Sequence, residues 1–421
     1  MSLENVVVSD VLVRSDAGIW GKDAGADGIS ILRSTNFRAD GELSFENLAI
    51  KSVEPRDRDR KLLLPGDILV EKSGGGPKQP VGRVCFFRGD RDPHVFGNFI
   101  ARLRVEPTRC DARFLFWFLH TSYQNGVTEN FQKQTTGIRN LEFKRFLSQR
   151  ITLPSLQEQR RFAELLDRAA EIRRRAEAAR AKARAIIPAL FLDTFGDPRS
   201  NPKGWRVAPL KDVAAVSYGS AAKLDTLLDE NGGRRIVTIS NVLIDGSIDR
   251  RVRRFYPASA EEIRKYSIRA GDLLFNWRSG SLDHIGKTAY VPSEFGGCLH
   301  VSFLLKVRAL HDMTHARFLW AMFNILRSRG YFKDNSREQI NRKFNASELS
   351  ALEVALPPVR LQTAFAEQVE RIEGLVRALD TAAAKAEAMA AALSAEMFDA
   401  GPRQGNGALA CAAVALGLRE M

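Results

Sequence analysis

The sequence has few cysteines, no long apolar run and no leader-like N-terminus. The four cysteines stand apart without a CxxC spacing, at Cys85, Cys110, Cys298 and Cys411. This pattern predicts incidental thiols in a reducing compartment rather than disulfides or a thiolate metal site. Because no charge-free apolar stretch of about 18 residues occurs and no basic segment precedes an apolar one at the start, we expect neither a membrane span nor a secretory signal. A cytoplasmic protein is predicted.

Motifs that carry chemistry are also missing. The sequence has no GxxxxGK(S/T), HExxH or GxSxG string, and none of the Asn-Pro-Pro-Tyr/Phe type that an adenine methyltransferase needs. His311 and His315 are four residues apart, but no nearby cysteine or carboxylate cluster completes a metal site. The glycine-rich stretch 73–78 resembles a phosphate loop only superficially, because Lys78 is not followed by Ser or Thr. We predict a chain that binds rather than reacts, with no catalytic residue, metal or cofactor of its own.

What the sequence has instead is an internal repeat of roughly 204 residues. The segment Pro-Gly-Asp-Ile-Leu at 65–69 returns as Ala-Gly-Asp-Leu-Leu at 270–274, and Ala-Arg-Phe-Leu at 112–115 returns at 316–319. The offset drifts slowly, as expected for a duplicated domain with small insertions. We interpret Asp67 and Asp272, which occupy equivalent positions, as turn residues. A duplicated protein favours a bipartite ligand.

Each copy mixes short strands with helices and is predicted to be an α+β domain of about 150 residues. Apolar segments bounded by Gly, Pro and Asp predict strands at 31–32, 68–70, 81–87, 236–239, 273–275 and 288–291. Two aromatic-rich segments, 112–120 and 316–326, predict buried helices.

A long heptad pattern follows each copy. Apolar residues alternate spacings of three and four in both segments, at Phe162, Leu165, Ala169, Ile172, Ala176, Ala179, Ala183, Ile186 and Leu190, and at Phe365, Val369, Ile372, Val376, Leu379, Ala383, Ala386, Ala390, Leu393 and Met397. This is the a/d seam of a coiled coil, and the simplest partner for each seam is the other one, folded back antiparallel. The alternative is an amphipathic helix that lies on its own domain. Some 35–40 helical residues give a rod on the order of 55 Å, and Pro188 predicts a kink or an early end in the first helix.

These patterns divide the chain into five segments. The two copies occupy 1–153 and 200–356, the first helix with its linker 154–199, the second helix 357–399, and a tail without predicted order 400–421. The net charge is +13, and most of the basic excess lies in the two copies, where a polyanion would be bound.

One string makes a family resemblance specific. Leu-Pro-Ser-Leu-Gln-Glu-Gln at 153–159, the basic helix after it, Phe-Gly-Asp-Pro at 195–198 and Asn-Pro-Lys-Gly-Trp at 201–205 follow one another. With the two Gly-Asp domains, this resembles the DNA-specificity subunit of type I restriction–modification systems, over residues 1 to about 399. The second copy departs from the pattern, since Leu-Pro-Pro-Val-Arg-Leu-Gln at 356–362 lacks the Glu-Gln ending and Phe398-Asp399 replaces Phe-Gly-Asp-Pro.

The resemblance implies that the two copies are target recognition domains, each reading one half of an asymmetric, split double-stranded DNA sequence. It implies further that the helices set the half-site spacing and dock two methyltransferase subunits, and that restriction subunits join the full complex. S-adenosylmethionine, ATP and Mg would then belong to these partners. Two other functions stay open: a self-contained restriction or methylation enzyme, and a structural protein that uses its coiled coil without binding DNA.

Candidate DNA contacts are polar side chains on two loops of each copy, because glycine-rich backbone can approach phosphate and long side chains can reach base edges. In copy one they are Lys72, Ser73, Lys78, Gln79, Gln132, Lys133, Gln134, Thr135, Thr136 and Arg139. In copy two they are Asn276, Trp277, Arg278, Ser279, Ser336, Arg337, Gln339, Asn341, Arg342 and Lys343. The basic cluster 173–175 is interpreted as an exposed helix face or a methyltransferase contact, and the cluster 250–254 as a possible phosphate contact.

Overall fold

The computed structural model describes residues 3–24, 28–76, 79–135, 138–222, 232–279, 281–335 and 342–399. The chain forms two compact units, unit 1 comprising residues 1–175 and 380–421, and unit 2 residues 176–379. This division cuts both long helices in the middle, whereas the predicted segments keep each helix whole. Several predicted positions lie outside the described residues: Lys78, Thr136, Ser336, Arg337, Gln339, Asn341 and the tail 400–421. Within the described residues, no helix combines the length and apolarity that a membrane span requires.

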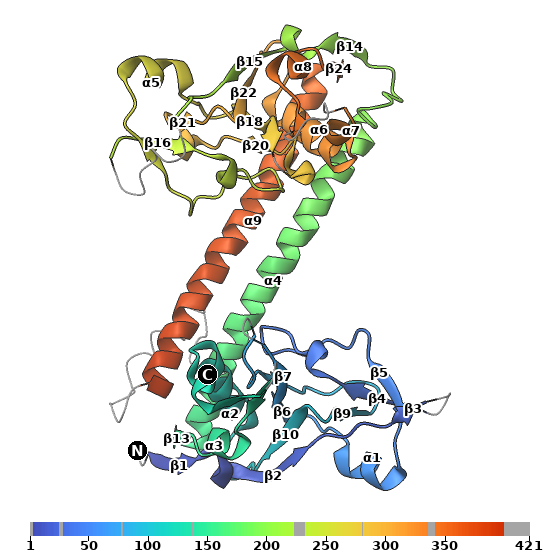
Figure 1. The fold of residues 1–421 in the computed structure, drawn as a ribbon, viewed down its shortest axis with the longest axis vertical. Coiled ribbons are helices and arrows are strands. Elements are labelled where there is room, and N and C mark those ends of the chain that lie inside the picture. The colour runs from blue at the N-terminus through green and yellow to red at the C-terminus, as the bar shows by residue number, and fades with distance from the viewer. Residues whose placement is uncertain are drawn as a thin grey trace. The chain divides into compact units, whose positions relative to one another are not determined.

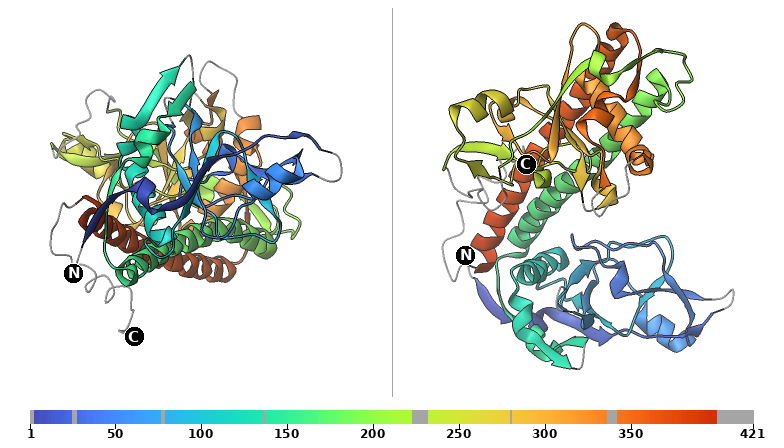
Figure 2. Two further views of the ribbon diagram at one scale, coloured as in Figure 1. Left: turned by 90° about the horizontal axis from the view of Figure 1, so that it is seen from below. Right: turned by 45° about the horizontal axis from the view of Figure 1, so that its top comes forward.

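Unit 1 is an α+β domain built around a four-stranded antiparallel sheet in the order β2-β10-β6-β8 (Figure 1). A second sheet, β3-β5-β4-β9, lies at the edge of the unit away from the long helices, and contains the parallel pair β4–β9. Figure 2 gives the same arrangement from two other directions. The strands are β1 Glu4–Val7, β2 Leu12–Ala17, β3 Lys22–Asp23, β4 Ile29–Leu32, β5 Ala49–Ser52, β6 Ile68–Glu71, β7 Ser73–Gly75, β8 Val84–Phe86, β9 His94–Phe96, β10 Ile100–Val105, β11 Gln132–Thr135, β12 Ile138–Leu141 and β13 Arg150–Leu153. The helices are α1 Pro55–Lys61, α2 Ala112–Gln124 and α3 Phe143–Leu147, and α4 Leu156–Phe195 follows.

Unit 2 repeats this topology, with the sheet order β15-β22-β18-β20 and a parallel pair β16–β21. Its strands are β14 Arg206–Pro209, β15 Ala214–Tyr218, β16 Arg234–Val237, β17 Phe255–Tyr256, β18 Leu273–Asn276, β19 Arg278–Ser279, β20 Thr288–Tyr290, β21 Leu299–His300, β22 Leu304–Ala309, β23 Arg342–Lys343 and β24 Glu353–Leu356. Its helices are α5 Ala260–Tyr266, α6 Ala316–Ser328, α7 Tyr331–Asp334 and α8 Ala346–Ser350, and α9 Val359–Ser394 follows, continued by a π turn Ala395–Asp399. The predicted duplication, the α+β class and the six predicted strand positions are confirmed.

Each copy is closed by pairing its first strand with its last. β1 pairs antiparallel with β13, with Glu4 opposite Leu153, and β14 pairs in the same way with β24, with Arg206 opposite Leu356. The chain therefore enters and leaves each copy at the same edge, directly before a long helix begins. This geometry explains why the Leu-Pro string stands at both helix starts.

The long helices pair antiparallel, and aromatic contacts inside each unit show the direction. In unit 1, Phe398 at the end of the α9 segment packs on Phe162 near the start of α4, with ring centroids 5.2 Å apart. In unit 2, Phe365 near the start of α9 packs on Phe191 and Phe195 at the end of α4, at 5.7 and 5.4 Å. The predicted antiparallel pairing is confirmed, and both helices also lie on their own domains, because these rings belong to the domain cores.

The predicted seam is correct over most of its length and wrong near the end of α4. Burial is nearly complete at Phe162, Leu165, Ala169, Ala176, Phe365 and Val369, and partial at Ile172, Ile372, Val376 and Leu379. Ile186, however, is 50% exposed, and its neighbour Ile187 is buried instead. The reason is helical periodicity: Ala183, Ile187 and Phe191 are spaced by four, so the buried stripe follows the 3.6-residue turn of a straight helix rather than a strict heptad.

Pro188 does not end the first helix. α4 continues without interruption to Phe195, so the predicted early end is wrong. Proline removes one backbone N–H donor from the helix, but Ile187 and Phe191 on either side are buried in the unit 2 core. Apolar packing of the flanking turns therefore outweighs the loss of one hydrogen bond.

Candidate nucleic-acid interface

The two loops that the sequence analysis selected in each copy come together in one strand ladder. In unit 1, β7 pairs with β12, with Asn140 opposite Ser73 and Arg139 opposite Gly75, and β11 completes a three-stranded sheet. In unit 2, β19 pairs with β23, with Arg278 opposite Lys343. Both predicted loops of a copy thus form one polar site beside the central sheet. This long-range pairing is invisible in the local sequence.

In unit 1 the predicted residues divide by what their side chains contact. Gln132 turns inward, because its Nε2 donates to the carbonyl oxygens of Val81 and Thr128 at 3.3 and 3.4 Å. Lys133 is exposed and forms an ion pair with Glu142 at 2.7 Å. The backbone of Gln134 and Thr135 lies in β11, while their side chains fall outside what the structure describes.

The remaining unit 1 candidates lie around β7. Lys72 and Ser73 are half-buried, and the Lys72 backbone bridges the ladder to the central sheet by donating to the Phe99 carbonyl at 2.9 Å. Gln79 is exposed, and its amide oxygen, when turned toward Arg83, accepts from the guanidinium Nη2 at 2.7 Å. Arg139 is half-buried on β12. Ser73 and Arg139 thus lie on the paired strands β7 and β12, and their role as DNA contacts stays a prediction.

In unit 2 one candidate is placed differently from the prediction. Asn276 is fully buried, and its Nδ2 donates to the His284 carbonyl at 3.1 Å. It occupies the position of Glu71, which is also buried, because inward-facing positions of the central strand are the same in both copies. In this structure Asn276 therefore holds the turn after β18 and does not lie on the surface, and its role as a DNA contact stays a prediction.

The other unit 2 candidates surround a small aromatic cluster. Trp277 donates from Nε1 to the Ser302 carbonyl at 2.7 Å and packs edge-on against Tyr218 at 5.4 Å. Arg278 lies over the ring of Phe303, 5.6 Å from its centroid. Ser279 and Lys343 are half-buried on the paired strands, whereas only the backbone of Arg342 is described. Trp277 is thus an anchor, and Arg278 is a half-buried member of the cluster that lies on the Phe303 ring.

The aspartate of each Gly-Asp segment forms a buried ion pair with an arginine of the central sheet. Asp67 is 1% exposed and accepts from Arg104 Nε and Nη2 at 2.7 and 2.8 Å. Asp272 repeats the arrangement with Arg308 at 2.6 and 2.7 Å. Hydrogen bonding to these carboxylates raises the pKa of both arginines. Each aspartate also accepts from a backbone N–H three residues earlier, so the predicted turn role is confirmed.

Removing this pair should destabilise the domain. We expect Asp272→Ala to lower the free energy of unfolding by about 2–3 kcal/mol, less than a fully buried pair would lose, because the Arg308 side chain is 34% exposed. Urea denaturation of the full chain measures this loss. Glu294→Ala, which removes an exposed pair with Arg250, is the control and should shift the midpoint far less. Equal shifts for both variants would contradict the structural role of Asp272.

The Leu-Pro string fastens each long helix to its domain through a buried glutamine. Gln159 Oε1 accepts from the Asp111 backbone N–H at 2.8 Å, and its Nε2 donates to the Pro154 carbonyl at 2.9 Å. Gln362 does the same with the backbone N–H of His315 at 2.8 Å and the Pro357 carbonyl at 2.8 Å.

The expectation that residues 356–362 lack the Glu-Gln ending of the Leu-Pro string is therefore only half right. The glutamine is present and performs the same task, and only the glutamate is missing. In copy one Glu158 forms a capping box with Ser155. Sequence reasoning missed the role of the glutamine, although its identical distance from Leu-Pro in both copies was an available signal.

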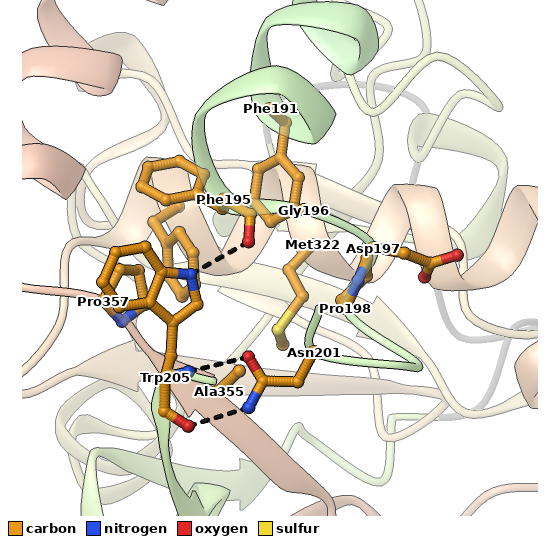
Figure 3. Close-up of a pocket in the computed structure, with 11 residues that line it drawn as sticks. Phe191, Phe195, Gly196, Asp197, Pro198, Asn201, Trp205, Met322, Ala355 and Pro357 are labelled. Carbon is orange, nitrogen blue, oxygen red and sulfur yellow. Dashed lines mark hydrogen bonds between the residues drawn. The ribbon is translucent and has the colours of Figure 1, made fainter. Parts of the chain in front are cut away.

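The Phe-Gly-Asp-Pro and Asn-Pro-Lys-Gly-Trp strings form the end of α4 (Figure 3). Trp205 Nε1 donates to the Phe195 carbonyl at 2.9 Å, and the Asn201 side chain bonds both the N–H and the carbonyl of Trp205, at 2.9 and 2.8 Å. Lys203 Nζ donates to the carbonyls of Asp193 and Thr194 at 2.6 and 2.9 Å. The last carbonyls of the helix are therefore satisfied by side chains.

The recess beside this cap is too small for a ligand. Phe191, Phe318 and Met322 line it together with Trp205, and its volume is about 10 Å³, which accommodates about one water molecule. The Phe-Gly-Asp-Pro and Asn-Pro-Lys-Gly-Trp strings thus have a structural role: they stabilise the C-terminal end of α4.

No group of three or more His, Cys, Asp or Glu in the described part of the chain is arranged to hold a metal ion. Burial lowers the pKa of His120 and of His300 to about 4, so both rings are neutral packing residues at neutral pH. His94 is buried against Asp90.

Two copies of one α+β domain, each joined to a long helix and each carrying a polar strand ladder, define a duplicated recognition protein. The chain belongs to the family of the type I restriction modification DNA specificity domain, whose model matches residues 31–179 and 202–383. Similar proteins carry matching names. The type I restriction enzyme EcoKI specificity subunit of Escherichia coli K12 is 24% identical over 344 residues, which is 77% of this chain and 70% of that protein.

A second relative and two solved structures extend the comparison. The putative type I restriction enzyme MjaX specificity subunit of Methanocaldococcus jannaschii is 28% identical over 179 residues, 42% of this chain and 41% of that protein. The match thus spans less than half of that relative. The crystal structure of a type I restriction–modification S subunit from M. genitalium has a TM-score of 0.60 at 12% identity, over 96% of this chain and 97% of that one. A solved structure from work on complex assembly and conformational transition of the type I R-M system has a TM-score of 0.51 at 16% identity. The match covers 94% of this chain and 97% of that one. These likenesses show the fold.

Proposed function

We propose that this chain is a DNA-specificity subunit that reads a bipartite, asymmetric double-stranded target, one half-site with each copy. One observation carries the proposal: the copies share their scaffold and differ in the ladder residues. The sheet order, the buried Asp–Arg pair and the buried glutamine are the same in both. The ladder presents Ser73 beside Asn140 in one copy and Arg278 beside Lys343 in the other.

Unlike ladders on like scaffolds favour an asymmetric target. Two identical readers would select a symmetric DNA sequence, since half-site symmetry mirrors protein symmetry. Serine and asparagine offer both donors and acceptors, whereas arginine and lysine offer only donors. The two ladders therefore suit different base edges, and the net charge of +13 suits binding to the phosphate backbone of both halves.

The helices supply a spacer between the half-sites. α4 is a single helix of 40 residues that belongs to unit 1 up to Arg175 and to unit 2 from Ala176, about 60 Å long at 1.5 Å per residue. Continuous helix transmits a length more faithfully than a flexible linker does. We propose that this length fixes the number of base pairs between the halves.

The chain then directs catalytic subunits to DNA rather than acting on DNA itself. We propose that two methyltransferase subunits dock on it, that restriction subunits join the full complex in the cytoplasm, and that S-adenosylmethionine, ATP and Mg are bound by those partners. The buried polar residues Gln159 and Asp272, which both copies share in kind, form hydrogen bonds to other groups of the protein and belong to the scaffold. This supports a binding role.

Gel retardation of the purified full chain with duplex DNA tests the proposal. Binding should weaken as salt rises, with a slope set by the number of phosphates contacted, and the chain alone should transfer no methyl group from added S-adenosylmethionine. Methylation or metal-dependent cleavage by the chain alone would support the self-contained enzyme instead. Indifference to DNA below about 50 mM salt, where electrostatic binding is strongest, would support the structural protein.

A further inference from the structure

Arg278 is a positioned guanidinium whose donors no described residue uses. Its side chain is half-buried and lies over the Phe303 ring at 5.6 Å. Elsewhere in the described residues, half-buried Arg83 is engaged by Glu71 at 2.7 Å and buried Arg317 by Glu373 at 2.6 Å. No carboxylate or other hydrogen-bond acceptor among the described residues engages Arg278 in this way. Within the part of the chain that the structure describes, the N–H donors of this rigid fork have no acceptor and can serve a ligand.

The backbone at Arg278 is fixed on both sides. Trp277 is tied by its Nε1 to Ser302, and its carbonyl accepts from the Phe344 N–H at 2.9 Å. Arg278 itself pairs with Lys343 across the ladder. The aromatic ring beneath the guanidinium adds a cation–π contact that limits its rotation. Such preorganisation lowers the entropy that binding must overcome.

The equivalent place in copy one has a ring but no guanidinium. Ser73 takes the position of Arg278 on β7, and Phe99, which corresponds to Phe303, is 48% exposed. The two copies thus differ at this point in one chemical group, so any recognition that Arg278 performs is confined to the second half-site.

We propose that Arg278 is a specificity-determining residue that reads one guanine in the half-site of the second copy, an inference that rests on the proposed function. Guanine presents two acceptors, N7 and O6, to the major groove, and an arginine fork bonds both. Adenine pairs its N7 acceptor with an N6 donor, which would face another donor of the guanidinium. Thymine offers one acceptor beside a methyl group, and cytosine offers a donor. A group that only donates therefore prefers guanine.

Selection of bound duplexes from a random pool by the full chain tests the assignment. The unaltered chain should enrich a guanine in one half-site, and Arg278→Ala should reduce preference at that base pair by about 5- to 150-fold. The other half-site should stay unchanged. Arg206→Ala, an exposed arginine on β14 opposite Leu356, is the matched control and should leave every preference intact. Thermal unfolding of each variant confirms that the chain is folded.

Two further variants distinguish recognition of the guanine base from nonspecific electrostatic binding to DNA. Phe303→Leu keeps an apolar side chain but removes the ring, and should weaken the same preference without changing its identity. Ser73→Arg places a guanidinium beside Phe99 and should add a guanine preference to the first half-site.

The alternative outcomes are distinct. A uniform loss of affinity for Arg278→Ala, with a salt slope smaller by about one and unchanged base preference, would identify a phosphate contact and overturn the inference. Selection of two half-sites with no response to Arg278→Ala would overturn it while the proposed function stands. Failure of the unaltered chain to enrich any sequence would overturn both.

Discussion

Insertion of four alanines after Ala179 is expected to lengthen the preferred spacer while leaving both half-sites unchanged. Four residues add about 6 Å of helix, close to two base-pair steps of ~3.4 Å. The original target should then lose simultaneous engagement of both halves, and its affinity should fall toward the nonspecific level, by about 10³-fold or more. The insertion leaves the ladders, the buried Asp–Arg pairs and both helix starts untouched.

Competition binding with duplexes that differ only in spacer length measures this effect. Four alanines added after Met421 serve as the control and should leave the spacer preference where it was. Loss of all sequence-specific binding at every spacer would mean that the insertion disrupts the fold, which thermal unfolding detects. An unchanged spacer in a folded variant would refute the role of the helix as a ruler.

Substitution of Phe365 should have the largest effect on stability. The ring is 1% exposed and packs on Phe191 and Phe195, so it joins the start of α9 to the end of α4 inside unit 2. Phe365→Ala removes a large buried side chain and leaves a cavity, for which we expect a loss of about 3–5 kcal/mol in the free energy of unfolding.

Urea denaturation followed by circular dichroism measures the loss. Leu375→Ala on the same helix is the matched control, because that side chain is 68% exposed, and it should change stability by about 0.5 kcal/mol or less. If both variants lose the same free energy of unfolding, the contacts of Phe365 with Phe191 and Phe195 do not hold the start of α9 to the end of α4.

The sequence predicted the duplicated architecture because the features that define it are periodic or repeated. The Gly-Asp strands, the two aromatic helices and the seam through Ala183 follow from spacing alone. The seam failed at Ile186, where a strict heptad and the 3.6-residue turn diverge by one position. Pro188 was weighed by local propensity, which the packing of Ile187 and Phe191 outweighs.

The site was predictable as a set of segments and not residue by residue. Local sequence indicated which loops are polar, and the structure joined them into ladders through pairs such as Arg278 with Lys343. It could not show that Asn276 points inward, because the burial that this position shares with Glu71 is set by the sheet and not by the local sequence. The placement of the Arg278 guanidinium depends on Phe303, 25 residues away in the chain, and no local pattern reports that contact.

The central claim is that the two copies read unlike half-sites at a fixed separation. Selection of duplexes from a random pool by the full chain, followed by sequencing of the bound DNA, tests it most directly. We expect two different short sequences, enriched together and separated by a constant number of unselected base pairs. Enrichment of one contiguous sequence, of two identical halves or of no sequence at all would contradict the account.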